Sequence, residues 1–112
     1  MTQKFSEVLH RLHATIHERK GADPSSSYTA KLLAEGAERA AKKFGEEAIE
    51  LVIAAAGGDP KAAIAESADL IYHWLVLMAA SGVNLDEIAN ELERREGTSG
   101  LAEKASRPGA SK

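Results

Sequence analysis

Apolar residues recur every three or four positions along most of this 112-residue chain. The first segment shows the rhythm in Phe5, Leu9, Leu12 and Ile16. That spacing places side chains on one face of a helix, and β-branched residues are too scattered to favour strands. The sequence therefore predicts an all-α fold. Its length limits it to one domain with a thin core, so we expect association with a second copy.

Turn and capping residues divide the chain into four predicted helices. The first ends near Gly21, and the turn-forming segment GADPSSS follows it. Asp59-Pro60 is typical of a helix start, and Asn84 with Glu87 three residues later is typical of a capping box. The second, third and fourth predicted helices cover residues 28–56, 60–80 and 85–95.

The C-terminal residues form a separate segment in this division. Residues 1–95 make the helical domain, and residues 96–112 (EGTSGLAEKASRPGASK) are small and polar. Such a tail is either flexible or becomes ordered over a ligand.

Composition excludes several classes of function. The chain has no cysteine, which rules out a disulfide scaffold, a thiolate metal site and a cysteine nucleophile. The net charge is -3 and no basic block occurs, which argues against a nucleic-acid binder. The N-terminus is polar, unlike a signal peptide, and the apolar stretch 70–80 is too short to span a bilayer. We expect a cytoplasmic protein with no membrane or nucleic-acid partner.

Three carboxylates share one face of the second predicted helix. At about 100° per residue, Glu46, Glu47 and Glu50 fall within an arc of about 100°. Arg39 and Lys43 lie on the same side. An ordinary solvated face with weak ion pairs would give the same pattern. This helix alone therefore leaves both interpretations open.

The third predicted helix carries Glu66 and Asp69 although it has almost no polar face. Ionised carboxylates that lose water without a partner cost several kcal/mol, so a cation or a proton must compensate them. Carboxylate oxygens suit Mg²⁺ or Mn²⁺ and not zinc. A di-iron bundle would need a Glu-x-x-His motif, which neither helix has. Mg²⁺ keeps waters and binds phosphates, which indicates phosphate-ester or phosphoanhydride chemistry.

The acidic spacing resembles a known signature. Glu46-Glu47-x-x-Glu50 followed by Glu66-x-x-Asp69 is similar to the EExxE and ExxD motifs of the MazG-like all-α nucleoside triphosphate pyrophosphohydrolases. Four further segments resemble the phosphoribosyl-ATP pyrophosphatase family of histidine biosynthesis: SYT at 27–29, KKFGEEA at 42–48, ADLIYHWLVL at 68–77 and SGLAEKA at 99–105. The resemblance covers residues 5–107. Phe44 departs from it, since smaller aliphatic residues are usual there, which affects packing and not chemistry.

The resemblance implies a four-helix MazG-like bundle, assembled as a homodimer, that uses Mg²⁺ (or Mn²⁺) to hydrolyse phosphoribosyl-ATP to phosphoribosyl-AMP and diphosphate. It implies metal ligands at Glu47, Glu50, Glu66 and Asp69. It implies catalytic roles for Glu46, Glu47 and Glu50, with Glu46 as an outer base or a ligand of a second metal. The residues expected to bind substrate are Arg19, Tyr28, Arg39, Lys42, Lys43, His73 and Lys104.

Some alternatives stay open on the sequence alone. A pyrophosphohydrolase that acts on free nucleoside triphosphates would use the same acidic residues, and a helical regulatory module would use them as an interface. His73 could bind metal, although a hydrogen-bonded core role is the commoner one. His10, His13 and His17 have the spacing of a metal-binding stripe, although a solvated face explains them equally well.

Overall fold

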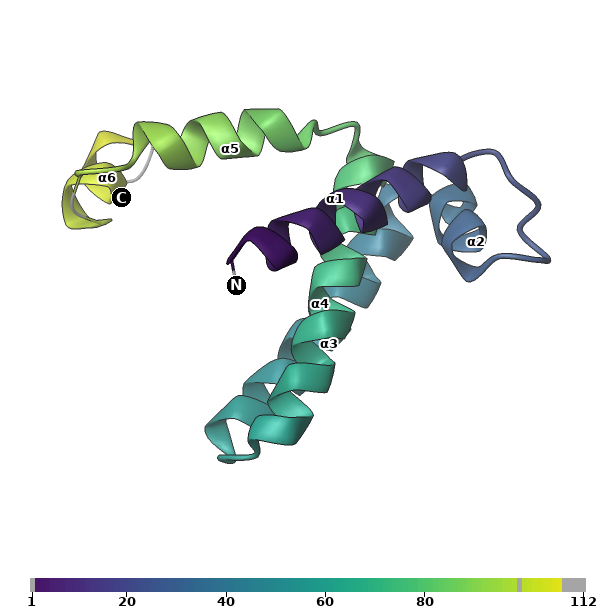
Figure 1. Ribbon diagram of the computed structural model, residues 1–112, viewed down its shortest axis with the longest axis horizontal. Helices are drawn as coiled ribbons and strands as arrows, with labels where there is room; N and C mark the ends of the chain where they lie inside the picture. The colour runs from purple at the N-terminus through teal and green to yellow at the C-terminus, as the bar shows by residue number, and fades with distance from the viewer. Residues whose placement is uncertain (1, 99, 108–112) are drawn as a thin grey trace.

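The computed structural model describes residues 2–98 and 100–107, and these residues form helices and no strands. Figure 1 shows their arrangement, which confirms the predicted all-α class. The helices are α1 (Thr2–Glu18), α2 (Tyr28–Glu35), α3 (Ala37–Ala56), α4 (Pro60–Ser81), α5 (Leu85–Arg94) and α6 (Gly100–Ser106).

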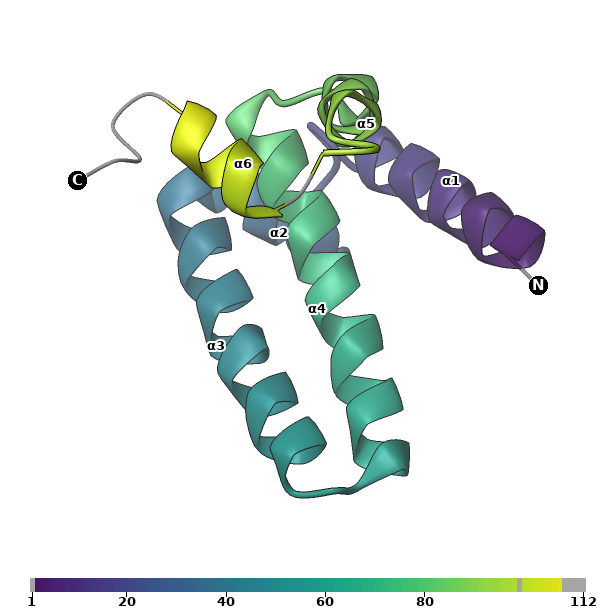
Figure 2. The same ribbon diagram turned by 90° about the vertical axis from the view of Figure 1, so that its left-hand side faces the viewer.

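The centre of the molecule is a hairpin of the two longest helices, α3 and α4, which lie side by side (Figure 2). A glycine pair ends α3, and the Asp59 side chain then accepts a hydrogen bond from the Ala62 N–H at 3.1 Å. Pro60 occupies the first turn of α4, where its missing N–H costs nothing. The predicted stop and start of these helices are confirmed.

The buried core lies at one end of this hairpin. Helices α1 and α2 pack there against α4, while the α3–α4 turn extends away from them (Figure 1). The core residues, each no more than 5% exposed, are Ile16, Leu32, Ala40, Leu75, Val76 and Ala79. The other half of the hairpin is thinly covered, and apolar side chains such as Ile53 (67% exposed) and Ile64 (72% exposed) face solvent there.

The predicted helix over residues 28–56 is wrong in one respect, because it is broken in two at Gly36. Gly36 has φ 95° and ψ 176°, a conformation that is essentially restricted to glycine. Its N–H closes α2 by donating to the carbonyls of Leu32 and Leu33, and α3 begins at the next residue. The break redirects α2, so that Tyr28 lies against Tyr72 and His73 of α4.

Helix α5 begins at the predicted capping box. The Asn84 side chain accepts from the Asp86 N–H at 2.7 Å, and Glu87 accepts from the Asn84 N–H at 3.4 Å. The segment predicted as a polar tail contains α6, a short helix that the sequence did not indicate. Residues 108–112 of that segment lie outside the described part of the chain. Together α5 and α6 project sideways from the body (Figure 1).

Helix α4 covers the predicted residues 60–80 and one more, so it extends well beyond the apolar stretch 70–80. With 22 residues it is long and apolar enough to cross a bilayer by length and composition. It nevertheless packs against α1, α2 and α3 and carries Glu66 and Asp69 near its middle. Core helices of water-soluble proteins meet the same criteria, and intramembrane carboxylates are rare.

Replacing Gly36 with alanine should destabilise the protein by about 1–3 kcal/mol, because alanine rarely adopts this backbone conformation. A Cβ there would meet nothing within 4 Å, so the cost comes from the backbone alone. Gly45, inside α3, also has open space around a new Cβ but no positive φ. Gly45→Ala should therefore stabilise by about 0.5–1 kcal/mol. Urea denaturation measures both, and equal effects at the two positions would contradict the break.

Candidate active site

Three carboxylates meet between the two helices of the hairpin. Glu47 of α3 and Glu66 and Asp69 of α4 each bring one oxygen within 4.8 Å of the other two. Glu66 and Asp69 are one helical turn apart, so both reach the same side of α4. Among the described residues this is the one group of three such side chains that could hold a metal ion. Three of the four predicted ligands are thus brought together.

Glu66 is the residue of this group under the strongest electrostatic stress. Its Oε1 is buried and has no hydrogen-bond partner in the described part of the chain. Burial raises the pKa of Glu66, and the negative charges of Glu50, Asp69 and Glu47 raise it further. A cation or a proton would relieve all these effects. The all-oxygen donor set fits a hard divalent cation such as Mg²⁺ or Mn²⁺.

Glu50 and Glu46 lie at the margins of the cluster. Glu50 is exposed on α3, yet it lines the same surface hollow as Glu66 and its charge acts on Glu66. Glu46 forms an ion pair with Lys43 at 3.3 Å. Glu46 is therefore oriented toward Lys43, in keeping with the separate role expected for it, and its role in catalysis stays a prediction.

A polar connection links α2 to the acidic cluster through His73. The buried His73 ring directs Nδ1 to the carbonyl oxygen of Asp69 at 2.8 Å, and Nε2 lies 3.4 Å from the Tyr28 hydroxyl. A carbonyl only accepts, so Nδ1 carries the proton, and Nε2 is then the acceptor for the Tyr28 O–H. Both ring nitrogens are engaged. His73 is thus a positioning residue in this structure, rather than a fourth member of the carboxylate group.

Of the predicted cations, Lys43 is the one that the fold brings to the acids. Its hydrogen bond to Glu46 and the nearby Tyr28 raise the pKa of Lys43, which keeps it charged. Arg39, one turn earlier, pairs with Glu35 at 3.5 Å. Lys42 is exposed on α3.

Two further predicted substrate residues lie apart. Arg19 is exposed in the turn after α1, and Lys104 is exposed on α6, which lies far from the hairpin in Figure 1. No contact among the described residues joins either of them to the carboxylates. In a single copy, therefore, Tyr28, Lys43 and His73 are the predicted substrate residues that border the site.

A link between Thr29 and Tyr72 was missed by the sequence reasoning. The Thr29 Oγ1 and the Tyr72 hydroxyl share a hydrogen bond, and burial raises the pKa of Tyr72. Ser27 caps α2 by accepting from the Ala30 N–H at 3.1 Å. The SYT segment thus does more than start a helix, because it attaches α2 to the turn of α4 that follows Glu66 and Asp69. The only signal was that Tyr72 adjoins His73.

A helical hairpin with convergent carboxylates is the arrangement of the MazG-like all-α pyrophosphohydrolase class. Residues 9–96 match the profile of the family described as PRA-PH, phosphoribosyl-ATP pyrophosphohydrolase. A phosphoribosyl-ATP pyrophosphatase of Caulobacter vibrioides is 66% identical over 107 residues, covering 96% of this chain and 99% of that protein. The protein of the same name from Cereibacter sphaeroides is 61% identical over 100 residues, covering 89% and 97%. The chain therefore belongs to the phosphoribosyl-ATP pyrophosphohydrolase family, as its motifs predicted.

Glu66→Gln should stabilise the metal-free protein at neutral pH, because it removes a buried charge from among three others. The pKa of Glu66 is higher in the folded protein than its value of 4.5 in the unfolded chain. Protonation of Glu66 therefore stabilises the folded state at low pH, and this stabilisation is lost as the pH rises through the folded-state pKa. The gain from Glu66→Gln should therefore shrink toward about pH 4. Thermal unfolding at several pH values measures this.

Glu93→Gln, at an exposed position on α5, is the matched control and should show no such dependence. Added Mg²⁺ should raise the melting temperature of the unaltered protein and of the control, but not that of Glu66→Gln. A Glu66→Gln protein that melts at a lower temperature than the unaltered protein at pH 7 would contradict the repulsion among these carboxylates.

Proposed function

We propose that this chain hydrolyses phosphoribosyl-ATP to phosphoribosyl-AMP and diphosphate, a step of histidine biosynthesis in the cytoplasm. The observation that carries the proposal is the carboxylate group of α3 and α4, with its unpartnered Glu66 oxygen. The class of substrate is supported by near full-length relatives at 61–66% identity that carry the name phosphoribosyl-ATP pyrophosphatase.

Glu47, Glu66 and Asp69 would hold the Mg²⁺ ion, with Glu50 contributing from the next turn of α3. When bound, such an ion neutralises phosphate charge and lowers the pKa of a bound water. Mn²⁺ has the same oxygen preference and is the alternative. This assignment gives each of the four predicted ligands a reason to be a carboxylate.

The other polar residues of the site would handle the substrate and the proton. The ammonium group of Lys43 faces the acidic edge and would contact a phosphate oxygen as a point charge. Glu46, held by Lys43, is the candidate base that accepts a proton from the attacking water. Tyr28, held by His73, would form a polar wall beside the nucleotide. Water adds to phosphorus, the phosphoanhydride bond breaks, and the leaving phosphate oxygen takes the electron pair.

We also propose that the protein works as a homodimer. An apolar groove on the side of α4 beside α1 is lined by Phe5, Ala63, Ile64, Ser67, Ala68 and Ile71. Phe5 is 56% exposed and Ile64 is 72% exposed, so burial of this groove against a second copy would stabilise an assembly. Most of the groove residues belong to α4, the helix whose sequence has almost no polar side.

Glu50→Gln should lower kcat/KM for phosphoribosyl-ATP by at least about 100-fold, because it removes one negative oxygen donor from the metal site. The helix content should not change, since Glu50 is exposed. Diphosphate release by the purified protein measures turnover, and circular dichroism checks the fold. Glu38→Gln, also exposed on α3 but in its first turn, is the control and should keep full activity.

The same assay with a panel of nucleoside and deoxynucleoside triphosphates separates the two enzyme activities. Preference for phosphoribosyl-ATP, together with rescue of a histidine auxotroph, supports the proposal. Preference for free triphosphates would support a nucleotide-cleansing enzyme instead. Full activity of Glu50→Gln would remove Glu50 from the metal site.

Ile64→Lys should weaken dimerisation by about 100-fold or more, because each twofold interface would contain two buried charges without partners. Thr15→Lys, at an exposed position of α1 outside the groove, is the control and should leave the dimer intact. Sedimentation equilibrium measures the dissociation constant of each. An unaltered protein that is monomeric at micromolar concentration would contradict the homodimer.

A further inference from the structure

Two histidine rings of α1 lie against each other, outside the acidic site. His13 and His17 are four residues apart, so they occupy successive turns on the same side of the helix. Their ring centroids are 4.4 Å apart, and the ring planes meet at 61°. The two histidines of helical zinc sites have the same i,i+4 spacing, because one ion can then reach both imidazoles. The spacing in the sequence is therefore realised as a pair of close rings.

The pair borders a hollow where α1 meets the connection between α4 and α5. The hollow has a volume of about 290 Å³ and is lined by both histidines, by Lys20 and by the chain from Gly82 to Asn84. That volume is enough for an ion with several waters. The third histidine of the helix, His10, lines a different hollow. The structure thus separates the pair from the rest of the histidine stripe.

The nitrogens of both rings are available to a ligand. Neither ring has a hydrogen bond or an ion pair with any described residue, whereas both nitrogens of His73 are engaged. Burial lowers the pKa of His13, and the neighbouring His17 and His10 lower it further. His13 is therefore mostly a neutral imidazole at neutral pH, which is the form that binds metal ions.

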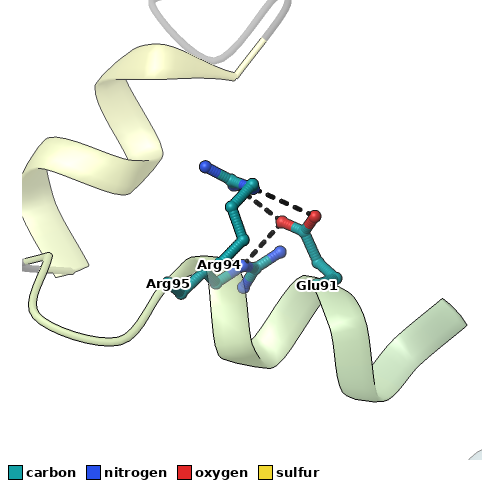
Figure 3. Close-up of polar contacts among 3 residues, drawn as sticks. All are labelled: Glu91, Arg94 and Arg95. Carbon is teal, nitrogen blue, oxygen red and sulfur yellow. Dashed lines mark hydrogen bonds and ion pairs between the residues drawn. The ribbon is translucent and has the colours of Figure 1, made fainter. Parts of the chain in front are cut away.

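A negative charge lies close to the pair. The Asp86 carboxylate, in the first turn of α5, is near enough to His13 to oppose the lowering of its pKa. Glu91, further along α5, is instead engaged by hydrogen bonds from Arg94 at 2.7 Å and from Arg95 at 2.9 Å (Figure 3). These hydrogen bonds lower the pKa of Glu91 to about 2. Asp86 is thus the acid of α5 that complements a cation at the pair.

The charges around the hollow favour a cation over an anion. Lys20 lines the hollow, and together with two protonated histidines it would attract phosphate. A neutral His13 adds no positive charge, however, and the negative Asp86 repels anions. Imidazole nitrogen suits Zn²⁺, Cu²⁺ and Ni²⁺, whereas Mg²⁺ prefers oxygen. The pair therefore differs from the carboxylate group in the metals that it selects.

We propose that His13 and His17 form a metal site, separate from the acidic group, that binds a divalent transition-metal ion such as Zn²⁺ where α1 meets the start of α5. Asp86 supplies negative charge beside the ion, and water fills the other coordination positions. Because the histidines belong to α1 and Asp86 to α5, bound metal favours the present position of α5. The inference does not rest on the proposed enzymatic function, since no residue of the acidic group takes part.

Zinc chloride, titrated into the isotope-labelled protein at neutral pH, tests the site. The NMR signals of the imidazole nitrogens of His13 and His17 should shift, because the metal binds at nitrogen, and zinc held by carboxylates would not shift them. His13→Gln and His17→Gln should each weaken zinc binding, measured by calorimetry, by at least about 10-fold, since one of two imidazole ligands is lost. Unshifted ring nitrogens at saturating zinc would overturn the proposal.

His10→Gln is the matched control, because it removes an exposed histidine of the same helix that lines another hollow. It should leave the zinc affinity of the pair unchanged. An equal loss in His10→Gln would overturn the pair, since any exposed imidazole would then serve. Glu66→Gln should keep the shifts of the two histidines, because it alters the acidic group alone.

Two charge changes distinguish a cation site from an anion site. Asp86→Asn should weaken zinc binding and Lys20→Gln should strengthen it, because they alter the charge beside the ion in opposite directions. Effects of the reverse sign, or ring-nitrogen shifts produced by inorganic phosphate and not by zinc chloride, would show an anion site and overturn the proposal. Hydrolysis of phosphoribosyl-ATP with Mg²⁺ should be unchanged in His17→Gln. Failure of the unaltered protein in that assay would count against the proposed function and not against this site.

Discussion

Repulsion among carboxylates held between two long helices governs this structure. The backbones that carry Glu47, Glu66 and Asp69 are held together, because α3 and α4 pack side by side. The unpartnered oxygen of Glu66 makes the metal-free arrangement costly. The fold tolerates that cost because its apolar core lies further along α4, around Leu75 and Val76. The apolar core and the acidic group thus occupy different stretches of the same two helices.

The break at Gly36 determines what faces the acids. A continuous helix would have carried Tyr28 along the axis of α3 and away from α4. The reversal instead sets Tyr28 against His73, whose other nitrogen holds the carbonyl of Asp69. One helical turn of α4 therefore supplies both a carboxylate of the acidic group and the histidine that contacts α2. A shift of α2 would therefore act on the backbone of Asp69 through the Tyr28–His73 and His73–Asp69 hydrogen bonds.

Local signals in the sequence predicted local features well. Asp59 and Asn84 begin helices because their side chains satisfy N–H groups that any helix leaves open, whatever surrounds it. The convergence of the acids also followed, because i,i+3 spacing and an apolar helix leave few other solutions. Gly36 was not recognised, since the apolar rhythm continues through it and a glycine within a helix is ordinarily tolerated. Helix α6 was missed because residues 100–106 are mostly small and polar, with no apolar face to mark them.

A single copy of this chain leaves two deficits. Its apolar surface beside Ile64 lacks a covering element, and its acidic site lacks cations for a phosphate-rich substrate. A thin core in a short chain makes the first deficit expensive. Burial of Phe5 and Ile64 against a second copy would supply free energy for the proposed assembly.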